Sequence, residues 1–251
     1  KPFCFLMPAA EAIYRPFQFA FIYDQPVWKP EDEPEKDLEK VPVDLAEKSE
    51  ELAHWLNNWL EKRYEVYAVR DRAYMELLKK ELESEAGEVT GLYEKDGKLH
   101  ALEAWWGLGK REERFYYTLS EIEPSDTHPA IMARIVTPEA FVPVIRLKQD
   151  AQTEQLRICL ELEDPLIPQN AGRWVWTLNH TESELEKLDG PIDTMEEALA
   201  RTQWDERRVL HLRIEAFTAW LFGYRIPEAV RAYPGAEQID VLSRVFLDEV
   251  V

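Results

Sequence analysis

Two aromatic stretches near the start of the chain, Phe3-Cys4-Phe5-Leu6-Met7 and Phe19-Ala20-Phe21-Ile22-Tyr23, decide the fold class. The first is a continuous apolar run ended by Pro8, which is typical of a strand buried on both faces. The second predicts another strand, closing at Asp24-Gln25-Pro26, and residues 9–17 between the two predict a short helical turn. Because an isolated strand pair is marginal in water, we expect these strands to need a partner sheet that this chain lacks.

A charged segment separates this start from the rest of the chain. Residues 29–40 are mostly charged, contain two prolines and have almost no apolar side chains, which predicts a solvated linker. Helical and alternating periodicity then predicts two helices followed by three strands, at about residues 45–64, 71–86, 88–93, 98–106 and 115–122.

Local signals mark the ends of these middle elements. Asp44 with Glu47 fits a capping box before the first helix, and Gly87 is placed to stop the second. The pair Asp96-Gly97 favours a tight type I′ hairpin between the first two strands. Gly107-Leu108-Gly109-Lys110 lies between two predicted strands with no helix after it, so we interpret it as a hairpin loop rather than a phosphate site.

The last part of the chain also alternates between strands and helices. Thr137-Pro138-Glu139 predicts a helix start after a strand, and Arg134 inside that apolar strand requires a buried acidic partner. The further elements that we expect are strands near 131–136, 156–162, 174–178 and 209–214 and helices near 138–144, 216–222 and 237–247.

Charge and cysteine content exclude several classes of function. A formal net charge of -19 over 251 residues argues against nucleic acid or an anionic membrane as a partner, and it would attract a cationic substrate. The two cysteines, Cys4 and Cys159, have no CxxC spacing, which argues against a zinc site or disulfide framework and fits a cytoplasmic location. The five histidines are scattered without ligand spacing, so no metal is expected.

The stretch from Phe5 to Phe19, Phe-Leu-Met-Pro-Ala-Ala-Glu-Ala-Ile-Tyr-Arg-Pro-Phe-Gln-Phe, resembles the end of the catalytic GNAT domain in Eis-type N-acetyltransferases. That family carries an Ile-Tyr-x-x-Phe-Gly-aromatic motif there, and Gln18 stands in place of its glycine, which we expect to alter a turn. Further stretches, at 69–74, 80–87, 131–136, 163–172 and 221–224, are similar to later parts of the family in the same order.

The resemblance implies an α+β fold in successive parts. Residues 1–28 would be the C-terminal edge of a catalytic GNAT sheet and residues 29–44 a linker. Residues 45–128 would form a second GNAT-like α/β domain, and residues 129–251 a sterol-carrier-protein-like domain. Because the chain lacks an initiating Met and opens inside a strand, we expect its natural N-terminus to lie upstream.

The resemblance also implies a reaction, the transfer of acetyl from acetyl-CoA to the amine of an aminoglycoside, a polyamine or a lysine. Such a transfer needs an acid for the departing thiolate and a base for the amine. The family's acid corresponds to Tyr14, and its base, the terminal carboxylate, would be that of Val251. Without the resemblance, Tyr14 would be a packed aromatic beside Phe17 and Phe19, and Val251 a frayed terminus.

The family's cofactor loop, an Arg/Gln-x-x-Gly-x-Gly/Ala sequence, does not occur in the chain, so we expect no cofactor-binding residues and no activity from this polypeptide alone. The family resemblance implies a homo-oligomer. One rival hypothesis treats residues 129–251 as a binding module for an apolar ligand, which would show a continuous apolar cavity. Another treats the later domains as scaffold or oligomer interface only.

Overall fold

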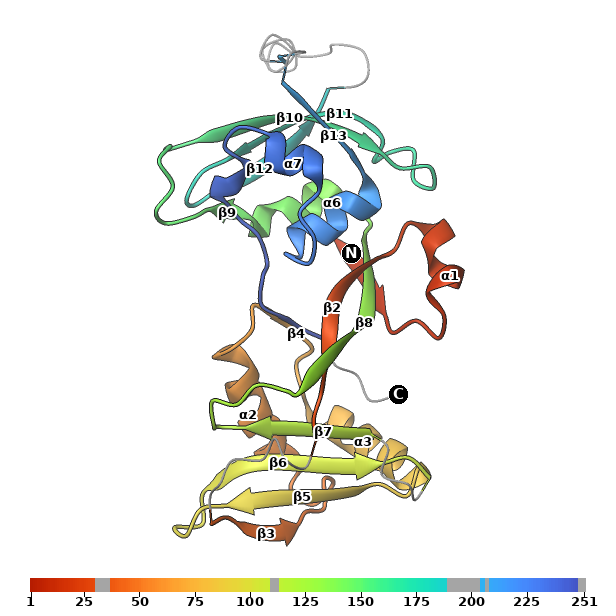
Figure 1. Cartoon of the computed structure of the whole chain (residues 1–251), viewed down its shortest axis with the longest axis vertical. Helices are drawn as coiled ribbons and strands as arrows, with labels where there is room; N and C mark the ends of the chain where they lie inside the picture. The colour runs from red at the N-terminus through yellow and green to blue at the C-terminus, as the bar shows by residue number, and fades with distance from the viewer. Residues whose placement is uncertain (30–36, 109–112, 189–203, 206–207, 248–251) are drawn as a thin grey trace. The chain divides into compact units, whose positions relative to one another are not determined.

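The computed structural model describes residues 1–29, 37–108, 113–188, 204–205 and 208–247 (Figure 1). The chain forms two compact units. The first contains residues 1–23 and 130–245, and the second contains residues 24–129 with the tail from Phe246 onward. The chain passes from one unit to the other within strands β2 and β8. The two units are described separately below.

The second unit is built on a four-stranded antiparallel sheet of strand order β3-β5-β6-β7. Its central strand, β6, is buried along almost its whole length, as expected for a strand covered on both faces. The elements of this unit are β3 (Glu39–Pro42), α2 (Ser49–Glu61), β4 (Val66–Tyr67), α3 (Arg72–Ser84), β5 (Glu88–Tyr93), β6 (Leu99–Trp106) and β7 (Glu113–Thr118). The predicted order of two helices and three strands is therefore present, with β3 and β4 added.

Helix α3 begins and ends close to where the sequence indicates. The Asp71 carboxylate accepts the Tyr74 N–H at 2.8 Å, which satisfies one of the free donors of the first turn. At the other end Ala86, not Gly87, takes the left-handed conformation, with φ 56°. Gly87 is required for a different reason, since a Cβ at this position would lie 2.8 Å from the Leu82 carbonyl oxygen.

Helix α2 is shorter than predicted. Asp44 caps a turn at residues 45–48 by accepting the N–H groups of Ala46 and Glu47, and the helix itself begins at Ser49. Trp59 of this helix is buried, and its indole N–H donates to the Thr118 carbonyl of β7 at 2.6 Å. The helix is thereby fixed to the sheet edge strand.

The β5–β6 hairpin differs from the predicted type I′ turn. Among residues 94–98 only Gly97 has a positive φ, 85°, whereas a type I′ turn needs two such residues. The Gly97 N–H donates to the Glu94 carbonyl at 2.8 Å, and the Glu94 N–H donates to the Lys98 carbonyl at 2.8 Å. This is a type I turn followed by a glycine bulge, which also accepts an Asp-Gly pair.

The first unit contains a sheet of strand order β12-β11-β10-β13, in which β10 and β13 are parallel. Helix α6 packs on this sheet through Phe217 and Trp220, whose rings lie 6.1 and 5.8 Å from the Trp176 ring of β11. The elements are α4 (Pro138–Phe141), β9 (Arg146–Leu147), β10 (Leu156–Glu163), β11 (Gly172–Leu178), β12 (Ser183–Lys187), β13 (Val209–Arg213), α6 (Ile214–Leu221), α7 (Glu228–Ala232) and β14 (Ile239–Asp240).

The opening strands β1 (Phe3–Leu6) and β2 (Ala20–Val27) belong to a three-stranded sheet with β8 (Asp126–Ile135) between them. β1 pairs antiparallel with β8, Cys4 opposite Arg134. The expectation that these strands lack a partner in this chain is therefore wrong, because β8 supplies one from more than a hundred residues away. β1 is only partly buried, and β2 continues past its predicted end, through Pro26 to Val27.

Two other predicted segments are different in the structure. Residues 39–42, which we expected in the linker, form the edge strand β3 and pair with β5. The predicted last helix at 237–247 is absent from these described residues. They contain a 3-10 turn at Ala236–Gln238 and two short strands, β14 paired with β9 and β15 (Val245–Phe246) paired with β4. Pairing with distant strands overrides the local helical pattern.

Candidate functional site

Tyr14 is the last residue of the four-residue helix α1 (Glu11–Tyr14), which a 3-10 turn at Arg15–Phe17 follows. The residue is half-buried, and its ring lies edge-on to that of Phe19 with 6.0 Å between the ring centroids, as expected for a packed aromatic side chain. Within the described part of the chain, no side chain or backbone group hydrogen-bonds the Tyr14 hydroxyl. The ring is thus packed, while its hydroxyl makes no hydrogen bond within the described residues.

The second predicted catalytic group, the carboxylate of Val251, lies outside the described residues. The last described side chains of the tail are well packed. Phe246 contacts Tyr64 at 4.8 Å and Trp59 and Tyr117 at 5.9 Å between ring centroids, all in the second unit. The role of Val251 therefore stays a prediction.

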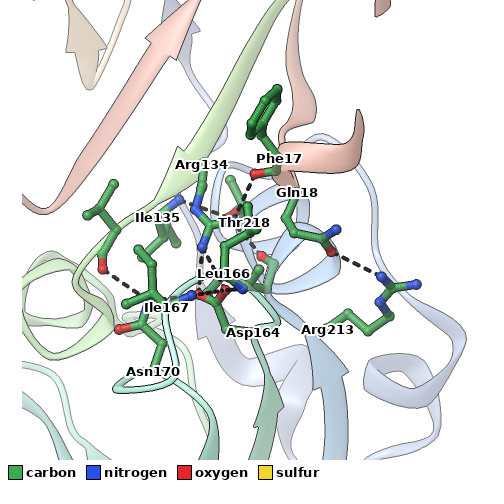
Figure 2. A network of polar contacts seen from close by, with 12 residues as sticks. Phe17, Gln18, Arg134, Ile135, Asp164, Leu166, Ile167, Asn170, Arg213 and Thr218 are labelled. Carbon is green, nitrogen blue, oxygen red and sulfur yellow. Dashed lines mark hydrogen bonds and ion pairs between the residues drawn. The ribbon is translucent and has the colours of Figure 1, made fainter. Parts of the chain in front are cut away.

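Gln18 occupies the position at which the resembling family has glycine, and it adopts the left-handed conformation that glycine favours, with φ 61°. Its side chain is buried and accepts a hydrogen bond from the Arg213 Nη2 at 3.0 Å (Figure 2). The turn survives the replacement of glycine because this hydrogen bond offsets the backbone cost of a side chain in that region.

Arg134 of β8 has the buried acidic partner that the sequence requires (Figure 2). Its Nη2 donates to both carboxylate oxygens of Asp164 at 2.7 Å, and its Nη1 donates to the Phe17 carbonyl at 2.8 Å. Asn170 donates to the same carboxylate at 2.9 Å and to the Val136 carbonyl at 3.0 Å. The network joins β8 to the loop that follows Tyr14.

The carboxyl group of Asp164 is held in its charged form. Burial would raise its pKa, but hydrogen bonds from the Ile167 N–H, the Asn170 amide, the Arg134 guanidinium and the Leu166 N–H together lower that pKa below its usual range. A charged and fully partnered Asp164 is consistent with a structural role for the pair, as the sequence suggests.

A pocket of about 500 Å³ lies beside the Tyr14 segment, entirely within the first unit. Tyr14 itself does not line it, but its neighbour Phe19 does. The lining combines an aromatic and aliphatic surface with charges of both signs. The lining residues are Glu11, Arg15, Phe19, Ala20, Phe21, Met132, Glu215, Ala216, Ala219, Tyr224, Arg225, Ile226, Pro227, Glu228 and Arg231.

Glu215 at the start of α6 connects this pocket to the loop after Tyr14. Its Oε1 accepts from the Arg213 Nε at 3.0 Å, and the same guanidinium donates to Gln18. Its other oxygen is buried and has no hydrogen-bond partner among the described residues. One side of the pocket wall thus carries a carboxylate whose position is set by Arg213.

Among the described residues no group of three or more histidine, cysteine, aspartate or glutamate side chains is arranged to hold a metal ion. His100, the one buried histidine of the described part, lies 2.8 Å from the Glu94 carboxylate and 2.9 Å from the Ser120 hydroxyl. Within the same residues, every helix is too short or too polar to cross a bilayer.

The sequence singled out Tyr14 as a candidate and required a partner for Arg134, but it did not indicate the contacts of Gln18, Arg213 and Glu215. Gln18 did carry a signal. A residue with a side chain at a position where the family has glycine indicates that a contact must offset the backbone strain of the turn. Arg213 gave none, because its partner lies 195 residues away in the chain.

Comparison with known proteins adds to this description. Residues 139–249 match the family described as a sterol carrier protein domain. A search of curated proteins finds no match.

Three solved structures share the fold over nearly the whole chain. A probable N-acyltransferase from Enterococcus faecalis has a TM-score of 0.60 at 17% identity, with 99% of this chain and 72% of that chain covered. A GCN5-related N-acetyltransferase from Anabaena variabilis has a TM-score of 0.59 at 16% identity, covering 99% and 71%. Eis1 from Mycobacterium abscessus has a TM-score of 0.55 at 11% identity, covering 98% and 72%.

These likenesses confirm the expected mixed fold. The described chain shares the mixed fold of the solved GNAT-type N-acetyltransferases, Eis1 among them, and its residues 139–249 match the sterol carrier protein domain family.

Proposed function

We propose that this chain is part of an acetyl-CoA-dependent N-acetyltransferase that acetylates an amine of a cationic acceptor. The observation that carries the proposal is the Tyr14 hydroxyl, which is free of hydrogen bonds among the described residues while its ring is fixed against Phe19. The shared fold of N-acetyltransferases supports the reaction class. Tyr14 would act as the general acid.

The proposed chemistry is a direct attack on the thioester. The neutral amine nitrogen bonds to the acyl carbon and the carbon–sulfur bond breaks, with the electron pair leaving on sulfur. The Tyr14 hydroxyl gives its proton to that thiolate. The terminal carboxylate of Val251 would take the proton that the amine loses, a role that requires burial to raise the low reference pKa of such a group.

The cationic class of acceptor is supported by charge. The chain has a formal net charge of -19, which attracts cations over distances set by the ionic strength. The pocket beside Tyr14 carries the carboxylates of Glu11, Glu215 and Glu228 and also the guanidinium groups of Arg15, Arg225 and Arg231, so the support for a cationic acceptor comes from the net charge of the chain.

The rival function, storage of an apolar ligand between the sheet and α6, has less support. Trp176, Phe217 and Trp220 occupy that space and are at most 2% exposed. Two pockets of the first unit, of about 500 and 460 Å³, are lined by charged as well as apolar side chains. We therefore favour acetyl transfer over lipid binding for the first unit.

We also propose that the protein acts as a homo-oligomer. Ile13 of α1 and Phe17 of the following 3-10 turn are 54% and 53% exposed, which is a large exposure for apolar side chains. Sedimentation velocity of the protein and of an Ile13→Ser/Phe17→Ser variant tests this. A single monomeric species for the unchanged protein would contradict it.

The decisive experiment is Tyr14→Phe in an enzyme that joins this chain to an acetyl-CoA-binding domain. Loss of the proton donor should lower kcat by about a hundredfold to ten-thousandfold while the acceptor KM changes little. Tyr67→Phe is the matched control, since Tyr67 is another half-buried tyrosine and lies in the second unit. Equal kcat values for both variants would reject Tyr14 as the acid.

Two further tests address the cofactor and the base. Calorimetric titration of this chain alone with acetyl-CoA should show no tight binding, because the phosphate-binding loop is missing from its sequence. Amidation of the Val251 carboxylate in the active enzyme should remove most of kcat. Unchanged turnover after amidation would assign the base elsewhere.

A further inference from the structure

We propose that Arg134 and Arg213 together clamp the loop of residues 15–19 and thereby position Tyr14 for proton transfer. This inference rests on the proposed function. It assigns the two arginines as positioning residues, since neither is described in contact with the Tyr14 hydroxyl.

The first arm of the clamp is rigid. The Arg134 side chain is 5% exposed and that of Asp164 is fully buried, so the ion pair fixes the plane of the guanidinium. The remaining Nη1 donates to the Phe17 carbonyl at 2.8 Å. Phe17 is the last residue of the 3-10 turn, so the carbonyl at the end of this turn is fixed relative to β8.

The second arm acts on the next residue. Arg213 stands at the N-cap of α6, and its Nη2 donates to the Gln18 Oε1 at 3.0 Å. Glu215 accepts from the Nε of the same guanidinium at 3.0 Å, which restricts its rotation. Gln18 needs such support because its backbone has φ 61°, a left-handed conformation that is unfavourable for a residue with a side chain.

A backbone hydrogen bond and a ring contact connect the anchored loop to Tyr14. The Phe19 N–H donates to the Tyr14 carbonyl at 3.4 Å, and the two rings contact each other. Helix α1 has only four residues, too few to be stable by its own hydrogen bonds. The orientation of the phenol is therefore set by the anchored loop rather than by the helix that carries it.

The clamp can be tested by amide hydrogen exchange on this chain without any catalysis. Arg213→Gln removes the second arm. Arg134→Lys keeps a charge for Asp164, but a single ammonium does not reproduce the two directions of the guanidinium fork. Each variant should speed exchange at residues 15–19 by about threefold to tenfold, since one charge-assisted hydrogen bond is lost. Arg157→Gln, which changes an exposed arginine of β10, is the matched control and should leave that exchange unchanged.

A double-variant cycle isolates the Gln18 contact. Gln18→Gly relieves the left-handed strain but removes the acceptor, so Arg213→Gln should add little to the exchange rate in its presence. Full additivity of the two changes, or no change in exchange at residues 15–19 for Arg213→Gln and Arg134→Lys, would overturn the clamp.

Kinetics of the enzyme joined to its acetyl-CoA-binding domain separate this inference from the proposed function. Arg213→Gln should lower kcat by about tenfold per folded molecule with little change in KM, and Arg213→Lys should restore part of it. If the two arginine variants exchange faster at residues 15–19 but Tyr14→Phe keeps full activity, then Tyr14 is not the general acid, although the clamp on the loop exists. If Tyr14→Phe lowers kcat but Arg213→Gln and Arg134→Lys leave kcat unchanged, then Tyr14 is the acid and the two arginines do not position it.

Discussion

Arg134 and Asp164 form a buried ion pair in which one guanidinium nitrogen lies 2.7 Å from each carboxylate oxygen. Neither side chain is more than 5% exposed. Removing two charges from water is expensive, and the pair is stable only because Phe17, Asn170 and two backbone N–H groups satisfy the remaining donors and acceptors.

Arg134→Met should therefore destabilise the protein strongly. It leaves the Asp164 carboxylate buried without its cation, and breaking a buried pair on one side costs about 3–5 kcal/mol in the free energy of unfolding. Urea denaturation followed by fluorescence measures this. The double variant Arg134→Met/Asp164→Leu should recover much of the loss, and a single-variant loss below about 1 kcal/mol would contradict the assignment of a buried pair.

The pH dependence of stability should contain a contribution from Asp164. Its pKa is lowered in the folded state, so between that pKa and the unfolded value of about 3.9 the unfolded chain binds more protons. The stabilisation is complete above the unfolded pKa and is lost as pH falls through the folded pKa. Denaturation of the protein and of Asp164→Asn at a series of pH values should give curves that converge below about pH 4. Parallel curves down to pH 2 would contradict the lowered pKa.

Gly223→Ala should be more damaging than Gly97→Ala. Both glycines have positive φ, 65° and 85°, so both replacements cost about 1 kcal/mol of backbone strain. At Gly223 the new Cβ would also lie 3.0 Å from the Leu242 carbonyl oxygen, whereas at Gly97 nothing lies within 4 Å. Thermal unfolding of the two variants compares them directly, and equal losses would show that the contact with Leu242 relaxes freely.

Phe217→Ala should show how much the aromatic core of the first unit contributes. The Phe217 side chain is fully buried between Trp176 and Trp220, and truncating such a residue costs about 3–5 kcal/mol. Leu77→Ala is the surface control, since Leu77 is 53% exposed on α3 and should change stability by less than about 0.5 kcal/mol. Urea titrations of both variants distinguish a packed core from a fluid ligand cavity, in which Phe217→Ala would cost little.

Local signals in the sequence predicted the features that depend on neighbouring residues. The predicted start of the second helix near residue 71 agrees with α3, where the Asp71 carboxylate accepts an N–H of the first turn, a contact between near neighbours that depends on no distant residue. Arg134 required a buried acid because an unpaired cation in an apolar strand is too costly. The identity of that acid, Asp164, was not predictable, since the fold alone brings the two residues together.

The errors arose where distant pairing decides the structure. Ile239 and Phe246 have helical spacing, but Ile239 pairs with Leu147 and Phe246 lies in a strand paired with β4. A single sequence does not reveal these partners. The strand near residues 131–136 was predicted, but its place between β1 and β2 was not, because its partners lie more than a hundred residues away.

The two cysteines differ in a way that makes the chain easy to label at one position. Cys159 is buried, with its sulfur accepting the Asp205 N–H at 3.3 Å, whereas Cys4 is exposed and lies opposite Arg134 on the neighbouring strand. Desolvation raises the pKa of the Cys4 thiol, with the positive charge of Arg134 opposing it in part, so a smaller thiolate fraction slows coupling to a maleimide dye at neutral pH. A fluorophore placed there would report on the surroundings of Arg134 without any engineered cysteine.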